Sequence, residues 1–308
     1  MKKPFLSIVI PVYNGEETIE KLHQRIQEFC NSHKHTYEVI FVWDCGPDNS
    51  WEVISQLKKQ HPTSIKAIHL SRNFGQHNAL ICGFEQAQGE FIVTMDEDLQ
   101  HLPEDIDSLI HYQKINNADV VYGFHNRQNH SPFRNITSNL LKSLIQIAIP
   151  KLHKNYSAFR LIKADIAKAC VNMQNSYTFL DGYLSWITNR FCSCSTNHQK
   201  RIAGESSYTF RKLLRHSINI FTTFSDLPIK MVSWLSISFL LFAISYSGYV
   251  FIQKTVLKTL IPGYASTIIL LSLGFGSVLF ALGIIGQYIH RINLKTTKQP
   301  NYHISENL

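Results

Sequence analysis

Two long stretches of the sequence contain no charged residue: residues 231–252 and residues 259–289. The hydrocarbon core of a bilayer is about 30 Å thick and takes about 20 residues of helix to cross, so each stretch is long enough to span it. A buried helix in a soluble core is the alternative. Two such stretches in succession, after what reads as a complete soluble domain, favour the membrane. We therefore predict two transmembrane helices, over about 231–252 and 262–289, in a multi-pass protein.

The distribution of basic residues predicts how these helices are oriented. Lysine and arginine flank the two stretches on their outer sides, whereas the loop between them holds only Lys254 and Lys258. The flanking residues are Arg211, Lys212, Arg215, Lys230, Arg291, Lys295 and Lys298. Because basic segments tend to stay in the cytoplasm, the N-terminal domain and the tail are expected there, with a short loop outside. A membrane surface then explains the net charge of +8 at pH 7, and no nucleic-acid partner is expected.

The N-terminal part of the chain alternates short apolar runs with helical patterns. The apolar runs at 6–12, 37–43, 65–70 and 91–95 predict strands covered on both faces, and a fifth strand is expected at 119–123. Strands that alternate with helices through short connections predict an α/β layer with a mostly parallel sheet. The turns after these strands are rich in polar side chains, and open parallel sheets bind their ligands at that edge.

An acidic stretch directly follows the fourth apolar run. Asp96, Glu97 and Asp98 come in succession, with Gln100 two positions later. Clustered carboxylates repel one another, and a partly buried anion needs a compensating cation. On an extended chain, Asp96, Asp98 and Gln100 share one face and offer the oxygen ligands that a divalent metal prefers beside substrate phosphates. The alternative is a solvated acidic turn that caps the helix expected near Pro103.

Six sequence motifs occur in order along the chain. They are SIVIPVYNGEETI, FVWDCGPDNSWEVI, LSRNFGQHNAL, VTMDEDLQHLPEDI, SAFRLI and RIAGESSYTFRKLL. This order resembles the family-two glycosyltransferases with the GT-A fold. More narrowly it is similar to the polyprenyl-phosphate glycosyltransferases, the group of dolichyl-phosphate mannose synthase and the bactoprenol glucosyl transferases. The resemblance covers essentially the whole chain. Two positions depart from it: Asp44 stands alone where many members have two acidic residues, and Gly15 occupies a position where an acidic residue is common.

The resemblance implies four parts of the chain. A GT-A catalytic domain spans 1–204, a juxtamembrane segment 205–230, the two membrane helices 231–290 and a cytoplasmic tail 291–308. The juxtamembrane segment has basic and apolar sides, as in an amphipathic interfacial helix that lies in the headgroup plane. A helix packed on the soluble domain would show the same pattern. The short apolar stretch 139–150 is equally compatible with a membrane-surface helix and a core helix.

The resemblance also implies a donor site. Asp96, Asp98 and Gln100 would bind a divalent metal, Mg²⁺ or Mn²⁺, which stabilises the departing diphosphate. The residues expected to bind the donor nucleotide are Pro11, Tyr13, Glu17, Asp44, Arg72 and Asp96. For Asp44 the alternative is a turn or helix cap. Arg72 is expected to pair with the metal-site carboxylates or with substrate phosphate, the alternative being an ordinary surface arginine.

An acceptor that carries a phosphate calls for arginines. The residues expected to bind it are Arg127, Arg134, Arg160 and Arg201. Asp181 lies in the region where related enzymes place a catalytic base, so the expected catalytic residues are Asp98, Arg160 and Asp181. A lipid monophosphate, with a second pKa of about 6, is mostly dianionic at neutral pH, so a base is a minor requirement. Asp181 would alternatively orient a sugar hydroxyl or pair with an arginine.

These expectations combine into one predicted function. The chain would be an inverting glycosyltransferase that moves one sugar from a nucleotide-sugar donor, expected to be UDP-linked, to undecaprenyl phosphate or a similar polyprenyl phosphate. The reaction would take place at the cytoplasmic face of the bacterial inner membrane. The alternatives are a glycolipid or polysaccharide acceptor, or a non-catalytic membrane adaptor of the same fold. Small residues along the membrane helices would allow a homo-oligomer.

Overall fold

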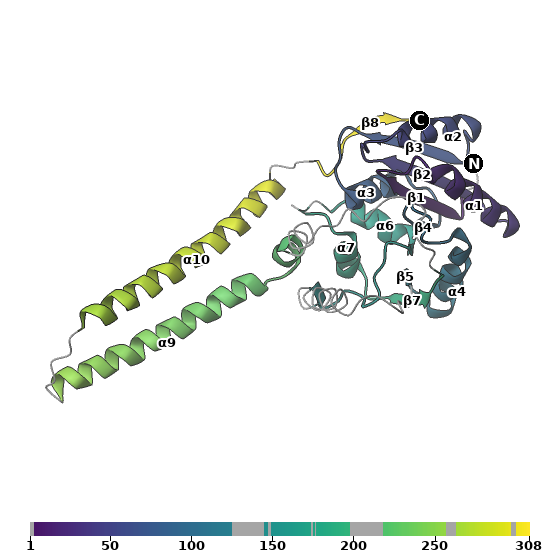
Figure 1. Cartoon of the computed structure of the whole chain (residues 1–308). Coiled ribbons are helices and arrows are strands. Elements are labelled where there is room, and N and C mark those ends of the chain that lie inside the picture. Colours follow the sequence, from purple (N-terminus) through teal and green to yellow (C-terminus); the bar gives the residue numbers. More distant parts are fainter. Residues whose placement is uncertain are drawn as a thin grey trace.

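The structure, a computed structural model, combines an α/β domain with a long helical hairpin that extends away from it (Figure 1). It describes residues 3–124, 145–146, 149–173, 175, 177–197, 218–256, 263–296 and 300–308. Most of the expected 139–150 helix and residues 205–217 of the juxtamembrane segment therefore lie outside the described residues. Residues 218–224 are helical.

The α/β domain is built on one eight-stranded sheet with the strand order β7-β5-β6-β4-β1-β2-β3-β8. The strands are β1 (Leu6–Val12), β2 (Tyr37–Trp43), β3 (Ile65–Leu70), β4 (Phe91–Thr94), β5 (Val120–Phe124), β6 (Arg160–Lys163), β7 (Phe191–Ser195) and β8 (Ile304–Asn307). Strands β1 to β4 pair with one another in parallel, as β5 does with β7, whereas β6 is antiparallel to β4 and β5, and β8 is antiparallel to β3. The predicted α/β fold with a mostly parallel sheet is confirmed.

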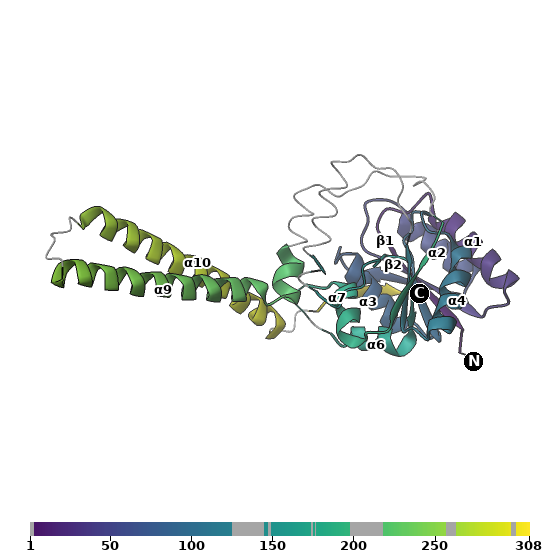
Figure 2. The same cartoon turned by 90° about the horizontal axis from the view of Figure 1, so that it is seen from below.

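Helices cover both faces of this sheet, as Figure 2 shows. The helices of the domain are α1 (Ile19–Ser32), α2 (Ser50–Gln60), α3 (Gln76–Gln86), α4 (Ile106–Asn116), α6 (Ala164–Val171) and α7 (Leu180–Ile187), with a 3₁₀ turn at Pro103–Asp105. Helices α1, α2 and α4 contribute to the apolar core on one face, and α3, α6 and α7 to the core on the other. Burial on both faces explains why β1 to β5 are predominantly apolar.

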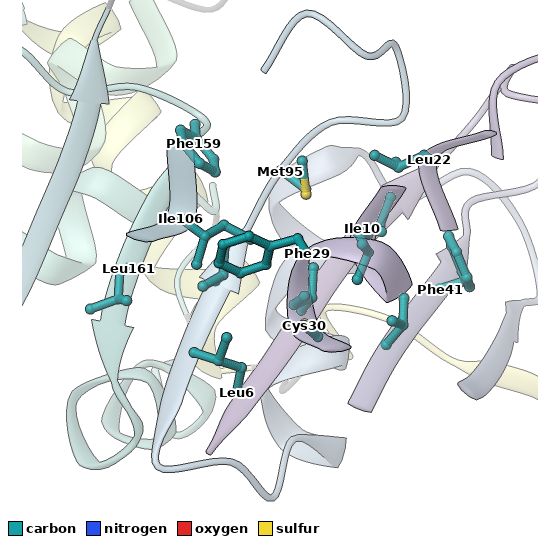
Figure 3. Close-up of a cluster of buried hydrophobic side chains, with 14 of the residues drawn as sticks. Leu6, Ile10, Leu22, Phe29, Cys30, Phe41, Met95, Ile106, Phe159 and Leu161 are labelled. Atoms are coloured by element: carbon teal, nitrogen blue, oxygen red, sulfur yellow. The ribbon is translucent and has the colours of Figure 1, made fainter. Parts of the chain in front are cut away.

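The core between the sheet and α1 contains side chains from one face of β1 (Figure 3). Leu6 and Ile10 of β1 point toward Leu22 and Phe29 of α1, whereas Val9, between them in the sequence, belongs to the core on the opposite face. Each such side chain contributes about 1.5–3 kcal/mol on burial. Packing in this core holds the four parallel strands in place, and so positions the loops that follow them.

The hairpin consists of α9 (Leu227–Thr255) and α10 (Tyr264–Thr296). Both helices are long and apolar enough to cross a membrane, and none of the described side chains in their most apolar windows is buried inside the molecule. With 29 and 33 residues, at about 1.5 Å per residue, they are longer than the roughly 30 Å of hydrocarbon. Helix α9 extends beyond the predicted 231–252 at both ends, whereas α10 starts two residues after the predicted 262 and continues past 289 to Thr296.

The segment after the hairpin returns to the sheet. β8 pairs antiparallel with β3, and Leu308 and Ala67 exchange two backbone hydrogen bonds. The Tyr302 hydroxyl donates to Glu85 Oε2 at 2.7 Å, and Asn301 Nδ2 donates to the carbonyl of Met173 at 3.2 Å. The expectation of a separate tail after residue 291 did not include this strand. The α/β domain thus contains segments that precede the hairpin in the sequence and a segment that follows it.

Deleting residues 300–308 is expected to destabilise the α/β domain, because it removes the Tyr302 bond and exposes the edge of β3 to pairing with other chains. We expect a loss of about 2 kcal/mol, or roughly 4–8 °C in unfolding temperature, with increased aggregation. Thermal unfolding of the purified protein in detergent measures this. The milder Tyr302→Phe variant should lose about 1 kcal/mol. Unfolding temperatures equal to that of the unaltered chain would mean that β8 does not stabilise the domain.

Candidate active site

The candidate site lies where the parallel strands β1 to β4 end. Because these strands run in the same direction, the loops 13–18, 44–49, 71–75 and 95–101 meet at one edge of the sheet. All of the predicted donor and metal residues except Pro11 lie in these loops. Pro11 is buried within β1, opposite Val42.

The acidic loop does not continue the strand. β4 ends at Thr94, and Leu99 has a φ of +58°, in the left-handed region. The backbone N–H of Gln100 donates to Asp98 Oδ1 at 3.1 Å, which closes a tight turn. The expectation that Asp96, Asp98 and Gln100 share one face of an extended chain is therefore wrong. A left-handed leucine costs about 1–2 kcal/mol, and here its burial in the core holds the turn and Asp98 in place.

The ligand types in this loop fit a hard divalent metal. Among the residues that the structure describes, no three His, Cys, Asp or Glu side chains come together as a ready-made metal site. Asp96 and Asp98 supply two carboxylates, and Gln100 supplies an amide oxygen. Mg²⁺ is typically held by one or two carboxylates together with substrate phosphates and water. The loop therefore suits a metal that binds together with the diphosphate.

Asp96 is held by a residue that the sequence analysis did not select. Gln76 Nε2, in the first residue of α3, donates to Asp96 Oδ1 at 2.6 Å. Gln76 is in turn placed by Asp44, whose two carboxylate oxygens accept the backbone N–H groups of Phe74 at 2.7 Å and Gly75 at 2.8 Å. Burial raises the pKa of the Asp44 carboxyl, and these two donors oppose the shift. Asp44 thus acts as a turn residue here, while its contact with the donor stays a prediction.

Glu97 joins the acidic loop to the loop after β1. Burial raises the pKa of its carboxyl, and hydrogen bonds from the backbone of Tyr13 and Asn14 partly oppose the shift. A Cβ atom at Gly15 would lie 2.9 Å from Glu97 Cγ, closer than real Cβ contacts. The glycine that departs from the family pattern is therefore explained by the side chain packed against it.

The loops after β1 and β2 are also locked together. A Cβ atom at Gly46 would lie 1.5 Å from the carbonyl oxygen of Tyr13, so only glycine permits this approach. The backbone N–H of Glu16 donates to Asp48 Oδ2 at 2.9 Å, and that of Gly15 donates to Ser50 Oγ at 3.0 Å. Between these contacts the Tyr13 side chain is 46% exposed. Its ring is thus accessible beside the expected nucleotide site.

The remaining two predicted donor residues are exposed. Glu17 lies in the turn that leads into α1. The guanidinium carbon of Arg72 lies 4.6 Å from the centroid of the Phe74 ring, a cation–π contact. The structure thus brings Arg72 to the correct edge of the sheet, and its pairing with carboxylates or phosphate stays a prediction.

Arg160 and Asp181 form a buried ion pair. Arg160 Nη1 donates to Asp181 Oδ1 at 2.6 Å, and the Tyr122 hydroxyl donates to the same oxygen at 2.9 Å. Arg160 is 2% exposed. Burial raises the pKa of Asp181, while Arg160 and Tyr122 oppose this shift. The alternative in which Asp181 pairs with an arginine is therefore the one that the structure shows.

This ion pair is adjacent to the acidic loop. In the sheet, Arg160 stands opposite Thr94, the last residue of β4, and opposite Tyr122 of β5. Thr94 lies two residues before Asp96. The pair thus borders the place where the donor diphosphate is expected. The other three predicted acceptor residues, Arg127, Arg134 and Arg201, lie outside the described residues.

Three features of the site were not predicted from the sequence: Gln76, the packing role of Glu97, and Tyr122. Glutamine at a helix start gives no periodic signal, and Tyr122 reads as one more apolar strand residue. Gln76 lies inside the LSRNFGQHNAL motif, so its position in a matched motif was the available clue.

A mostly parallel sheet that carries an acidic loop at its carboxyl edge is the arrangement of a glycosyltransferase with the GT-A fold. Residues 7–171 match the sequence model described as Glycosyl transferase family 2. The chain belongs to this family.

Relatives extend the similarity over almost the whole chain. An uncharacterized glycosyltransferase of Bacillus subtilis (strain 168), YkcC, is 33% identical, over 97% of this chain and 93% of its own length. The undecaprenyl-phosphate 4-deoxy-4-formamido-L-arabinose transferase of Yersinia pestis (strain Pestoides F) is 29% identical, over 98% of this chain and 93% of its own length.

Among solved structures, the fold is similar to that of glucosyl-3-phosphoglycerate synthase from Mycobacterium tuberculosis in complex with Mn²⁺ and UDP-glucose. The TM-score is 0.53 at 14% identity, and the match covers 71% of this chain and 77% of that protein. This similarity supports the GT-A fold. The two apolar helices of the hairpin support membrane association.

Replacing Arg160 by methionine should leave Asp181 as a buried charge without its cation. Breaking such a pair from one side costs about 3–5 kcal/mol, whereas an apolar replacement of both partners is often neutral. We therefore expect Arg160→Met to lower the unfolding temperature strongly and the double variant Arg160→Met/Asp181→Leu to recover most of the loss. Thermal unfolding of the two variants tests this. A single variant as stable as the unaltered protein would show that the pair is not desolvated as described.

Replacing Gln76 by alanine should weaken metal binding, because the hydrogen bond that orients Asp96 is lost. Hydrogen bonds to charged groups contribute about 1.5–3 kcal/mol, less when exposed, so we expect a roughly threefold to tenfold higher half-saturating Mn²⁺ concentration. Titration of Mn²⁺ in the presence of nucleotide sugar measures it. Gln86→Ala, at the far end of the same helix, is the matched control and should leave the titration unchanged. Equal titrations for both variants would contradict this role of Gln76.

Proposed function

We propose that the protein is an inverting glycosyltransferase that moves one sugar from a nucleotide sugar, expected to be UDP-linked, to polyprenyl phosphate, with undecaprenyl phosphate as the expected acceptor. The proposed place of reaction is the cytoplasmic face of the bacterial inner membrane. One observation carries the proposal: similarity to a transferase named for undecaprenyl phosphate extends over 98% of this chain, through the apolar hairpin as well as the α/β domain.

The proposed donor half of the reaction follows from the acidic loop. Asp96 and Asp98 would hold Mg²⁺ or Mn²⁺ at the donor diphosphate. When bound, the metal neutralises the charge that builds on the departing nucleoside diphosphate. Gln76 holds Asp96, and the Asp98 turn is held by buried Leu99. The chain therefore supplies two oriented carboxylates without further rearrangement of the sheet.

The proposed acceptor half needs little help from a base. With a second pKa of about 6, a lipid monophosphate is mostly dianionic at neutral pH. One phosphate oxygen attacks the anomeric carbon from the face opposite the diphosphate, the bond from that carbon to the diphosphate oxygen breaks, and the configuration inverts. Asp181 need not take a proton, which agrees with its hydrogen bonds from Arg160 and Tyr122. Its proposed task is to hold Arg160 beside β4.

Sugar-nucleotide turnover by the full chain in lipid nanodiscs tests the proposal. With undecaprenyl phosphate, labelled UDP-sugars and Mn²⁺ or Mg²⁺, we expect a lipid-linked monosaccharide, and EDTA should abolish it. The double variant Asp96→Ala/Asp98→Ala should lose about 10³-fold in rate, as expected when charge stabilisation of a leaving group is removed. Asp107→Ala, which removes an exposed carboxylate of α4, is the matched control and should retain full activity.

Other outcomes point to the alternatives. A polymeric product, or transfer only to a glycolipid without phosphate, would replace the proposed acceptor. Nucleotide-sugar binding without turnover on any acceptor would indicate a non-catalytic adaptor. An unaffected double variant would remove Asp96 and Asp98 from the mechanism.

A further inference from the structure

The residues just before the membrane hairpin pack against α7. Phe224 lies three residues before the start of α9. The centroid of its ring lies 4.7 Å from that of Trp186, 5.9 Å from that of Phe179 and 6.1 Å from that of Tyr183. Tyr183 and Trp186 lie within α7, and Phe179 directly precedes it. One side chain at the base of the hairpin therefore contacts successive turns of this helix.

The contact is close enough to dictate a glycine. A Cβ atom at Gly182 would lie 2.4 Å from Cε1 of the Phe224 ring and 2.8 Å from its Cδ1 and Cζ atoms. Real Cβ atoms do not come this close to another atom. Glycine weakens a helix, so its presence in the first turn of α7 has a packing reason. The phenyl ring occupies the space that any other side chain at position 182 would need.

Gly182 directly follows Asp181. The carboxylate of Asp181 connects α7 to Arg160 of β6 and to Tyr122 of β5. The first turn of α7 therefore bears two contacts in succession: one to the candidate site through Asp181, and one to the hairpin through Gly182. In the sheet, Arg160 of β6 stands opposite Thr94 at the end of β4, where the acidic loop begins.

The second helix of the hairpin, α10, also contacts the segment directly before α9. The Tyr288 hydroxyl, in α10, donates to the carbonyl oxygen of Ser225 at 3.0 Å, one residue after Phe224. Trp186, whose ring is tilted by 38° against that of Phe224, keeps 49% of its surface exposed. A half-exposed tryptophan near the end of a membrane helix is typical of the region where headgroups meet water. Figure 1 shows α7 beside the start of the hairpin.

We propose that Phe224, seated on Gly182, is a positioning residue that aligns the Asp181–Arg160 pair with the phosphate of a membrane-bound acceptor. This inference rests on the proposed function. The acceptor phosphate is held at the height of the bilayer surface, whereas the donor is held by the sheet. Phe224 packs the segment directly before the hairpin against α7, the helix of Asp181. Because misplacement by about 1 Å can cost on the order of 100-fold in rate, loss of the Phe224–Gly182 contact would impair transfer to the lipid.

A purely structural contact would behave differently from a positioning contact. Loss of a structural contact lowers the unfolding temperature and weakens every step together. Loss of alignment with the membrane spares nucleotide-sugar binding and spares transfer to a short-chain polyprenyl phosphate that is soluble in water. The ratio of activity on undecaprenyl phosphate in a bilayer to activity on the short-chain phosphate therefore separates the two roles.

The test uses Gly182→Ala and Phe224→Ala in the full chain in nanodiscs. For each variant we expect kcat/KM for undecaprenyl phosphate to fall by about 10–100-fold. We expect the donor Kd and the rate with the short-chain phosphate to change by less than about twofold, within ordinary mutational scatter. Gly276→Ala, a glycine of α10 with no atoms within 4 Å of the added Cβ, is the matched control and should leave all three quantities unchanged.

A double variant sharpens the test. Removing the phenyl ring makes room for the alanine methyl group, so Gly182→Ala/Phe224→Ala should be no worse than Phe224→Ala alone. This non-additivity is expected only of two side chains that share one space. Additive losses in the double variant would show that the two positions act separately, and would overturn the proposal.

Two further results would also overturn it. Single variants as active as the unaltered protein on undecaprenyl phosphate would refute this inference alone. Equal losses in donor binding, short-chain transfer and lipid transfer would reduce the contact to a structural one. Failure of the proposed function is recognised separately, since the unaltered protein would then give no lipid-linked product, and this inference would fall with it.

Discussion

The carboxyl edge of this sheet is organised by carboxylates that are too buried to remain unpaired. Removing a charged group from water is costly, so each one must be met by hydrogen-bond donors or a cation. Asp44 accepts hydrogen bonds from backbone N–H groups of the loop after β3, and Glu97 accepts them from the loop after β1. Asp181 accepts hydrogen bonds from Arg160 and from the Tyr122 hydroxyl. The same interactions that satisfy these anions fasten the loops of neighbouring strands to one another.

The three successive acidic residues of the acidic loop have different roles. Asp96 and Asp98 are the expected metal ligands, whereas Glu97, between them, is packed against Gly15 and serves the scaffold. The acidic loop is thus held from two sides, by Gln76 on α3 and by the loop after β1. A glycosyltransferase gains from such support, because carboxylates that are oriented before the substrate arrives need no reorganisation as charge develops.

The hairpin is joined to the α/β domain at both of its ends. Before α9, Phe224 packs on α7, and after α10, the chain returns to add β8 to the sheet beside β3. A catalytic domain held by two connections has a more limited choice of orientations at a membrane than one on a single flexible linker. For the proposed lipid-phosphate acceptor, this restriction would help to bring acceptor and donor to a common height.

The sequence by itself determined the α/β fold, the family, the acidic motif and the two apolar helices, because these features are local. A buried strand, a membrane-spanning helix or a short motif is visible within some four to twenty neighbouring residues. Only the tertiary structure decided that the acidic loop turns at Leu99, that Glu97 explains Gly15, that Gln76 holds Asp96, and that β8 belongs to the sheet. The partner of a buried charge, or of a four-residue edge strand, is chosen among groups far away in the chain. No local pattern records that choice, because it depends on which surfaces the folded core brings together.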